Sequence, residues 1–278
     1  MKFLVLALSL AAVVGVSSCS DKYGKTMSLD SDIAFTTITR SATYSLVGSA
    51  NDFGSDKDIQ FYDSVSIVMP VRISGVDITT LCESIAAYAF DAAPGTPIMG
   101  AAAKWMSNRP GESGYKVKLA TTIDDTSFGE AYVNGFVYTL TPSLLVYCVR
   151  SESLEPGAAH GMNSTRYINF VYSDASSVKG IITLKDIFTK DGLKELPSII
   201  GDRASDLFSA IGPTGVDALP ENDNFYINAM GEIVFSYQPY EIASYAQGNI
   251  EISFAPYELV DLFTDKGISF FGLEDLND

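Results

Sequence analysis

The sequence predicts an α+β fold made of two mixed subdomains, each a mainly antiparallel sheet packed with one or two helices. Three observations lead to this prediction. Long segments rich in β-branched and aromatic residues favour strands. Only a few segments repeat apolar residues at helical spacing. Strands and helices do not alternate regularly, as they would in a doubly wound parallel sheet.

The first subdomain is expected to begin with two strands and a helix. Residues 33–48 and 58–73 have strand composition, and Pro70 marks an edge or a bulge in the second of them. Residues 75–91 change to helical spacing, which predicts an amphipathic helix. Three prolines and four glycines predict irregular chain over residues 93–114. The next segment, up to residue 132, fits either a helix or a strand.

The second subdomain is expected to hold most of the strands. Residues 135–153 read as a hairpin around Thr141-Pro142, and residues 190–211 form the clearest amphipathic helix of the chain. Met230-Gly231 predicts a tight turn between two further strands. The remaining expected elements are strands at 165–174, 179–188 and 250–254 and a short closing helix at 256–263.

The N-terminus predicts export and a lipid anchor. Lys2 precedes an apolar run too short to span a bilayer comfortably, and Val16-Ser17-Ser18-Cys19 has the form of a lipobox. Cleavage before Cys19 would leave a cysteine that carries a lipid and holds the chain at a membrane surface. The alternative is an ordinary secretory signal cut near the same place. The side of the envelope, whether outer membrane, periplasmic or surface-exposed, stays open.

These readings divide the chain into four parts. The expected parts are a signal peptide at 1–18, a polar tether at 19–32, an N-terminal α+β domain at 33–133 and a C-terminal α+β domain at 134–278.

The charge balance limits the class of partner. The formal net charge is −16, and it becomes −17 once Lys2 leaves with the signal peptide. Nucleic acid needs a basic patch, so it is not an expected partner. An acidic surface attracts a basic partner, although it also serves simple solubility.

The sequence holds few residues of the kinds that catalysis and metal binding use. His160 is the only histidine, and Cys82 and Cys148 both lie in apolar segments, where they can pack as free thiols or pair as a disulfide. This set cannot supply a zinc site, and no EF-hand loop, nucleophile elbow or phosphate-binding glycine loop is present. We therefore expect no enzyme activity, no cofactor and no metal. Paired carboxylates are too numerous to exclude a glycan hydrolase.

Two segments have the composition expected of contact surfaces. Within "FSYQPYEIASYAQG", Tyr237, Tyr240 and Tyr245 stand around Pro239 with the carboxylate of Glu241 among them. Tyrosines on a proline-braced loop are good binding anchors, although such rings can instead fill a core.

The second segment is "GAAHG", which reads as a turn. Its glycines permit close or left-handed backbone, and His160 can form a hydrogen bond from the corner. A structural role for His160 is the first interpretation, ahead of ligand contact by His160 and Gly161 and ahead of catalysis.

Several short motifs in a fixed order carry a resemblance to a known family. The stretches "GAAHG", "LKDIF", "NFYI", "PYEIASYAQG" and "ISFAPYEL" follow one another, and "DIQFYDSVSIVMP" precedes a helix around Leu81. Together they resemble the RsiV-like and PdaC-like extracytoplasmic proteins over about residues 33–262.

The resemblance implies an envelope binding or sensing module. In this family RsiV is a membrane-spanning anti-sigma factor whose extracellular part binds lysozyme, and PdaC joins a similar region to a peptidoglycan deacetylase domain. We expect this chain to have neither the anti-sigma segment with its transmembrane helix nor the deacetylase domain. The implied partners are a basic protein such as lysozyme, or peptidoglycan or another wall glycan. A peptidoglycan or glycan hydrolase, or a deacetylase-associated enzyme, is the alternative.

Overall fold

A computed structural model describes most of the expected folded region. It describes residues 33–47, 59–73, 75–112, 116–119, 128–155, 158–208 and 223–276. The predicted signal peptide, the tether and Cys19 lie outside these residues.

The chain folds as two compact units. Unit 1 combines Met1–Phe136 with Val149–Asn163, and unit 2 combines Val137–Cys148 with Ser164–Asp278. Three long strands supply residues to both units, and the predicted boundary between residues 133 and 134 falls inside the first of them. These strands are β4 (Phe128–Leu140), β5 (Leu144–Leu154) and β6 (Met162–Val171).

The predicted α+β class is confirmed, because the chain forms two sheets and several helices. A seven-stranded sheet has the order β3-β1-β2-β4-β5-β6-β7, and a three-stranded sheet has the order β10-β9-β8. The pairs β1–β2, β1–β3, β6–β7, β8–β9 and β9–β10 are antiparallel, whereas β2 and β4 run parallel. The strands not yet given bounds are β1 (Ile33–Val47), β2 (Ile59–Ile73), β3 (Lys116–Leu119), β7 (Gly180–Ile182), β8 (Phe225–Ile227), β9 (Ile233–Tyr237) and β10 (Ile250–Phe254).

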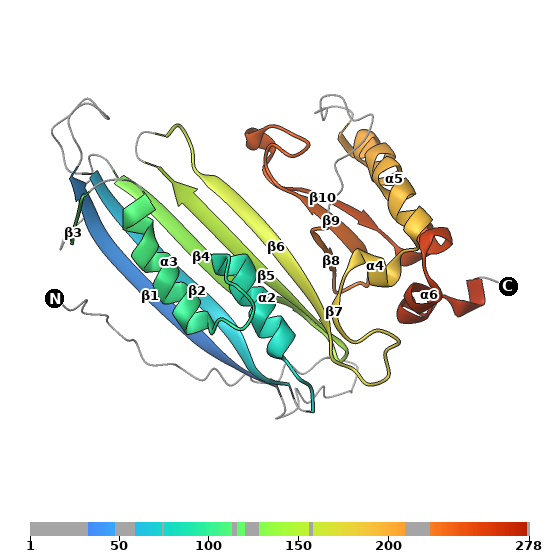
Figure 1. The fold of residues 1–278 in the computed structure, drawn as a ribbon. Coiled ribbons are helices and arrows are strands. Elements are labelled where there is room, and N and C mark those ends of the chain that lie inside the picture. Colours follow the sequence, from blue (N-terminus) through green and yellow to red (C-terminus); the bar gives the residue numbers. More distant parts are fainter. Residues whose placement is uncertain are drawn as a thin grey trace, which may run out of the picture. The chain divides into compact units, whose positions relative to one another are not determined.

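Unit 1 packs its two helices on one face of its strands. Figure 1 shows α2 (Thr79–Phe90) and α3 (Ile98–Glu112) on the same side of the sheet. Alternate side chains of β2, from Phe61 to Met69, are buried, as the period of two of a strand requires. Leu81 and Ile85 of α2 are fully buried, so its apolar stripe faces the core.

Helix α3 is an element for which the sequence-based prediction was wrong. Irregular chain was expected because of its prolines and glycines. Pro97 stands just before the helix, and its carbonyl accepts a hydrogen bond from Ala101 N at 3.0 Å. Proline is tolerated at the start of a helix, because the backbone N–H that it lacks would have no partner within the helix there. Alanine has the highest helix propensity, and Ala101 and Ala102 are also buried, so both local preference and tertiary packing favour this helix.

Unit 2 builds its core between the small sheet and the helices around it. One face of this sheet is wholly apolar and buried, and α5 (Lys190–Phe208) lies beside it (Figure 1). The predicted helical face of α5 is confirmed by the burial of Leu196, Ile200 and Ala204. The apolar residues of that sheet face are Phe225, Ile227, Ile233, Phe235, Tyr237, Ile250, Ile252 and Phe254.

Two predicted turns are confirmed, and the chain end holds more helix than expected. Thr141 N donates to Leu144 O at 2.9 Å between β4 and β5, and Gly231 adopts φ +83° between β8 and β9. The predicted closing helix is the 3-10 helix η2 (Pro256–Leu262). The other short helices are α4 (Leu184–Ile187), α6 (Asp265–Phe271), η1 (Tyr245–Gln247) and η3 (Glu274–Leu276).

Side-chain amides connect β6 to the small sheet within unit 2. Asn169 donates from Nδ2 to Phe225 O and accepts from Ile227 N through Oδ1, both at 2.9 Å. Asn224 accepts from Tyr167 N at 3.1 Å and donates to Thr165 O at 2.8 Å. Each buried amide thus takes the place of a paired backbone group, which satisfies donors and acceptors that would otherwise be buried without partners.

Cys82 and Cys148, the two cysteines in the described residues, are thiols that are not joined in a disulfide. Cys148 is buried in β5, and Cys82 is half-buried in α2. Burial raises the pKa of the Cys82 thiol, so this thiol is held in its unreactive protonated form.

Candidate functional site

The predicted turn residues His160 and Gly161 belong to unit 1. His160 is exposed, and its Nδ1–H donates to the carbonyl of Gly161 at 2.9 Å. Gly161 lies close to β5, where a Cβ atom would stand 2.8 Å from Ser153 O. Gly161 is therefore required for close packing of the chain, and His160 lies at the surface beside it.

The predicted contact loop of unit 2 is pinned at its base. Tyr237 is only 1% exposed and belongs to the core, and Pro239 is buried. Glu241 accepts a hydrogen bond from Gln238 N at 2.7 Å, so its carboxylate closes the turn that Pro239 begins. Gln238 in turn accepts from Thr165 N at 2.7 Å and donates to Thr165 O at 2.8 Å.

Two tyrosines of this loop reach the surface. Tyr240 is 57% exposed, and its ring centroid lies 5.9 Å from that of Tyr245. Tyr240 also adopts φ +71°, which is uncommon for a residue with a side chain. Its backbone N donates to Ala243 O at 2.9 Å, which stabilises this conformation. The loop thus divides its tyrosines between core and surface.

A cluster of three tyrosines around a carboxylate forms a site that the sequence reasoning missed. We call Tyr138, Tyr167, Tyr226 and Glu251 the tyrosine–Glu251 cluster. Tyr226 and Tyr167 donate to the two carboxylate oxygens of Glu251, at 3.1 and 3.3 Å. The ring of Tyr138 meets those of Tyr226 and Tyr167 edge-on, with centroids 5.0 and 5.3 Å apart.

The cluster is buried at one side and open at the other. Tyr226 and Tyr167 are 4% and 9% exposed, whereas Tyr138 is 44% exposed and Glu251 is also exposed. Desolvation raises the pKa of Tyr167 and of Tyr226, and the nearby negative charge of Glu251 raises both further. Both phenols therefore stay protonated and keep donating to the carboxylate, which fixes its orientation.

Sheet pairing explains why this cluster escaped prediction. Its members come from β4, β6, β8 and β10, so no short stretch of sequence contains more than one of them. The one available signal was alternation: Tyr226 and Glu251 occupy polar-face positions in strands whose other face is apolar.

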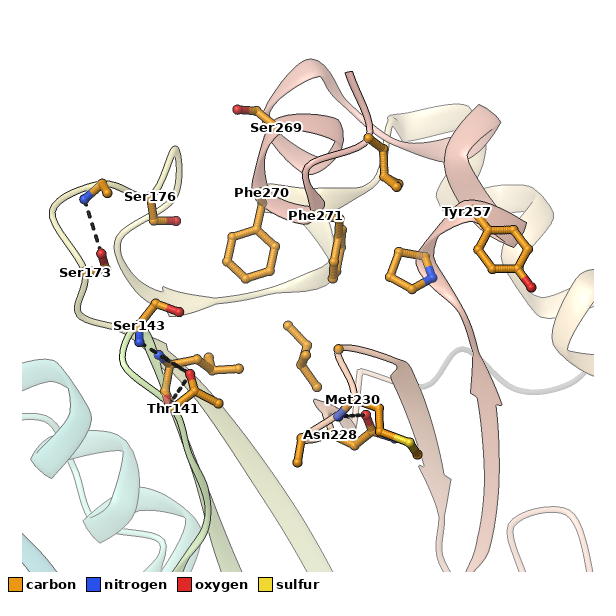
Figure 2. Close-up of a pocket in the computed structure, with 17 residues that line it drawn as sticks. Thr141, Ser143, Ser173, Ser176, Asn228, Met230, Tyr257, Ser269, Phe270 and Phe271 are labelled. Carbon is orange, nitrogen blue, oxygen red and sulfur yellow. Dashed lines mark hydrogen bonds between the residues drawn. The ribbon is translucent and has the colours of Figure 1, made fainter. Parts of the chain in front are cut away.

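Unit 2 also contains a pocket of about 580 Å³. Figure 2 shows Phe270 and Phe271 on one side of it, across from Thr141 and Asn228. Turns and helix ends from five parts of unit 2 meet there. The lining consists of Thr141, Ser143, Leu144, Ser173, Ala175, Ser176, Ile227, Asn228, Ala229, Met230, Gly231, Pro256, Tyr257, Ser269, Phe270, Phe271 and Leu273.

Unit 1 holds a buried carboxylate of its own. Asp63 on β2 is 0% exposed, accepts a hydrogen bond from Tyr44 Oη at 2.8 Å, and lies 3.6 Å from Arg109 Nε. Glu155 approaches the same guanidinium to 3.8 Å. Burial raises the pKa of Asp63 in spite of these partners. Arg109 is the residue that ties the end of α3 to the sheet.

Within the residues that the structure describes, no three His, Cys, Asp or Glu side chains group as a metal site would require. In the same residues, none of the helices has both the length and the apolar character of a membrane span.

Comparisons with known proteins find a family match for one region of the sequence and similar solved structures for most of the fold. Residues 185–258 match the model of the family described as "Protein of unknown function (DUF3298)". A search of the curated proteins gives no match.

Two solved structures resemble the chain over most of its length. A member of the DUF3298 family from Bacteroides fragilis has a TM-score of 0.63 at 20% identity, covering 87% of this chain and 98% of its own. A DUF3298 family protein from Pseudomonas aeruginosa has a TM-score of 0.49 at 13% identity, covering 83% and 94%. The chain is therefore similar to the DUF3298 family over residues 185–258 and has the fold of the B. fragilis protein.

Proposed function

We propose that this chain is a lipid-anchored binding protein of the cell envelope, without catalytic activity, that docks a basic protein partner on unit 2. The observation that carries this proposal is the tyrosine–Glu251 cluster, in which the exposed ring of Tyr138 packs on the two tyrosines that orient the exposed carboxylate of Glu251. The resemblance to RsiV-like proteins, which predicts a binding or sensing role, supports the same class of function.

The geometry of the cluster suits a cationic side chain. An arginine or lysine can stack on the exposed ring of Tyr138 while it forms an ion pair with Glu251. Two tyrosine hydroxyls already hold Glu251 in place, so binding loses little side-chain entropy. The chain's formal net charge of −16 would speed the approach of such a partner.

The anchor rests on the N-terminal sequence. A lipid on Cys19 would hold unit 1 and unit 2 at a membrane surface, with residues 19–32 as the tether. A partner free in the envelope would then be captured at that surface.

A non-catalytic role is supported by the local partners of the two side chains that a wall hydrolase would use, with Glu241 as the catalytic acid and His160 assisting it. His160 belongs to unit 1 and pairs with Gly161 O, and Glu241 of unit 2 closes its own loop. Each side chain has a local structural partner. A wall-hydrolysis assay compares the wild type with His160→Ala and Glu241→Gln. We expect no turnover in any of them, and turnover that either substitution abolishes would establish the hydrolase instead.

Capture of a basic protein by the mature chain tests the docking. Hen lysozyme is the probe, and Tyr138→Ala and Glu251→Gln are the variants. Each should weaken capture about tenfold, because a stacked cation and an oriented ion pair are each worth roughly 1–2 kcal/mol. Glu195→Gln is the matched control, since Glu195 is an exposed acid on α5 of the same unit. Equal weakening by Glu251→Gln and Glu195→Gln, with no effect of Tyr138→Ala, would reduce the effect to net charge and reject the docking site.

A further inference from the structure

We propose that the pocket of unit 2 is a separate ligand site, and that it takes an uncharged saccharide with acceptor-rich substituents. The inference is independent of the docking of a basic protein, because no member of the tyrosine–Glu251 cluster lines this pocket.

The size of the pocket fits a small ligand. Its volume of about 580 Å³ lies within the range of ordinary ligand sites. All of its lining residues belong to unit 2, so one compact unit forms the whole cavity.

One wall is aromatic and held in place from behind. The rings of Phe270 and Phe271 meet edge-on, with centroids 4.8 Å apart. Phe271 in turn stacks on Phe263, with centroids 5.3 Å apart and an angle of 22° between the rings. A ring fixed in this way offers a flat apolar surface at low entropy cost, which suits the C–H face of a pyranose.

A second wall presents hydroxyl groups oriented by turns. Ser173 Oγ accepts from Ala175 N, and Ser176 Oγ accepts from Val178 N, both at 3.3 Å. Each of these hydroxyls uses an oxygen lone pair in its turn and therefore retains its O–H to donate. Figure 2 shows Ser173 and Ser176 at the same edge of the pocket, on the loop that follows β6.

A third wall is set by Asn228. Its Oδ1 accepts from Met230 N at 2.9 Å and from Glu232 N at 3.0 Å, so the amide is locked in the turn between β8 and β9. Its Nδ2 donates one hydrogen to Glu232 Oε2 at 2.6 Å and has a second hydrogen. The second amide hydrogen of Asn228 and the hydroxyl hydrogens of Ser173 and Ser176 can therefore donate into the pocket, which suits carbonyl and ether oxygens on the ligand.

The lining decides the charge of the ligand. Among the lining residues that the structure describes, there is no Asp, Glu, Lys, Arg or His. An ammonium or carboxylate group would lose hydration there and find no opposite charge among these lining residues, and the Glu232 carboxylate beside Asn228 already accepts a hydrogen bond from its amide. An N-acetylated sugar meets the requirement, because it combines an apolar ring face, a carbonyl acceptor and no net charge.

Titration with two matched oligosaccharides tests the proposal. The probes are the tetramer of N-acetylglucosamine and its fully deacetylated counterpart, and binding to the mature chain is measured by calorimetry. We expect the acetylated tetramer to bind at least about tenfold more tightly, since one desolvated, unpaired charge already costs more than tenfold in affinity. No binding of the acetylated tetramer, or tighter binding of the deacetylated one that persists in Glu251→Gln at high salt, would overturn the proposal.

Two variants localise the binding. Phe270→Ala removes the aromatic wall, and Ala175→Trp fills the pocket from an exposed loop position that does not disturb the core. Each should weaken the acetylated tetramer at least about tenfold, whereas Phe136→Ala, an exposed ring of unit 1, and Glu251→Gln should leave it unchanged. Unchanged binding in Ala175→Trp would overturn the assignment to this pocket. Loss of binding in Glu251→Gln would place the saccharide on the tyrosine–Glu251 cluster instead.

Discussion

The side chain of Asn169 forms the hydrogen bonds that a neighbouring strand would otherwise make, and removing it should lower the stability of the protein. The substitution Asn169→Leu leaves Phe225 O and Ile227 N buried without partners. Each unsatisfied group costs about 1–3 kcal/mol, so the free energy of unfolding should fall by about 2–4 kcal/mol. Urea denaturation measures this loss. Asn108→Leu, at an exposed position of α3, should change it by less than about 0.5 kcal/mol. A loss below about 1 kcal/mol for Asn169→Leu would show that water replaces the amide.

Asp63 should make the stability of unit 1 depend on pH. Burial raises its pKa above the ordinary 3.8, so the folded chain binds this proton more tightly than the unfolded chain does. The resulting stabilisation is complete below the ordinary value and is lost as the pH rises through the folded-state pKa. The groups that face the carboxyl are Tyr44, Arg109 and, across the guanidinium, Glu155.

The measurement compares wild type with Asp63→Asn across pH. As the pH falls from about 8 to about 4, the wild type should gain stability relative to the variant, because only the wild type takes up the extra proton on folding. A constant difference between the two curves would show that Asp63 titrates at an ordinary value.

Only part of the candidate site could be predicted from the individual residues of the sequence. The loop from Tyr237 to Tyr245 was recognised by its local density of rings, and Tyr240 and Tyr245 do reach the surface. The burial of Tyr237 could not be read from that density, since a strand directs alternate residues inward only once its register is known. The role of Glu251 could not be predicted for the same reason, because its tyrosine partners come from strands that are distant in the sequence.

At the scale of elements, two glycines in helices should respond in opposite ways to alanine. In α5 a Cβ at Gly192 would stand 2.5 Å from Leu262 O, so Gly192→Ala forces α5 away from η2. This overpacking should cost about 1–3 kcal/mol. In α3 a Cβ at Gly100 meets nothing within 4 Å, so Gly100→Ala should stabilise the protein by about 0.5–1 kcal/mol. Thermal unfolding of the two variants measures both effects, and stabilisation by Gly192→Ala would contradict the close packing of α5 on η2.

Helices and turns that are marked by local sequence patterns could be predicted. Features that depend on contacts between distant parts of the chain could not. The turns at Thr141 and at Gly231 and the apolar face of α5 follow from turn chemistry and periodicity. Helix α3 was not predicted because its prolines and glycines outweighed the helix preference of Ala101-Ala102-Ala103, and the burial of its alanines is known only from the fold. The parallel pairing of β2 with β4 was also out of reach, since sequence alone rarely fixes which distant strands become neighbours.

At the scale of the whole molecule, the proposed anchor makes the location of the chain depend on one thiol. Cys19→Ser in the full-length precursor should abolish incorporation of labelled palmitate and move the protein from the membrane fraction to the soluble fraction. A control substitution, Ser20→Ala, should leave both unchanged, because residue 20 follows the modified cysteine. Retention of Cys19→Ser in the membrane fraction would show that another feature holds the chain there.

The acidic surface of the whole chain and the tyrosine–Glu251 cluster make separable contributions to capture of a basic partner. The net charge of −16 acts at long range and is screened by salt, whereas the oriented carboxylate of Glu251 acts at contact distance. Wild type and a charge-neutralised surface variant should therefore converge at high salt, while a cluster variant should remain weaker.

The affinity of the mature chain for lysozyme, measured for wild type and Glu251→Gln at low and at high salt, tests the docking of a basic protein most directly. We expect the wild type to bind and the variant to bind about tenfold more weakly at both salt concentrations. No binding by the wild type at low salt, or equal affinities of wild type and variant, would contradict it.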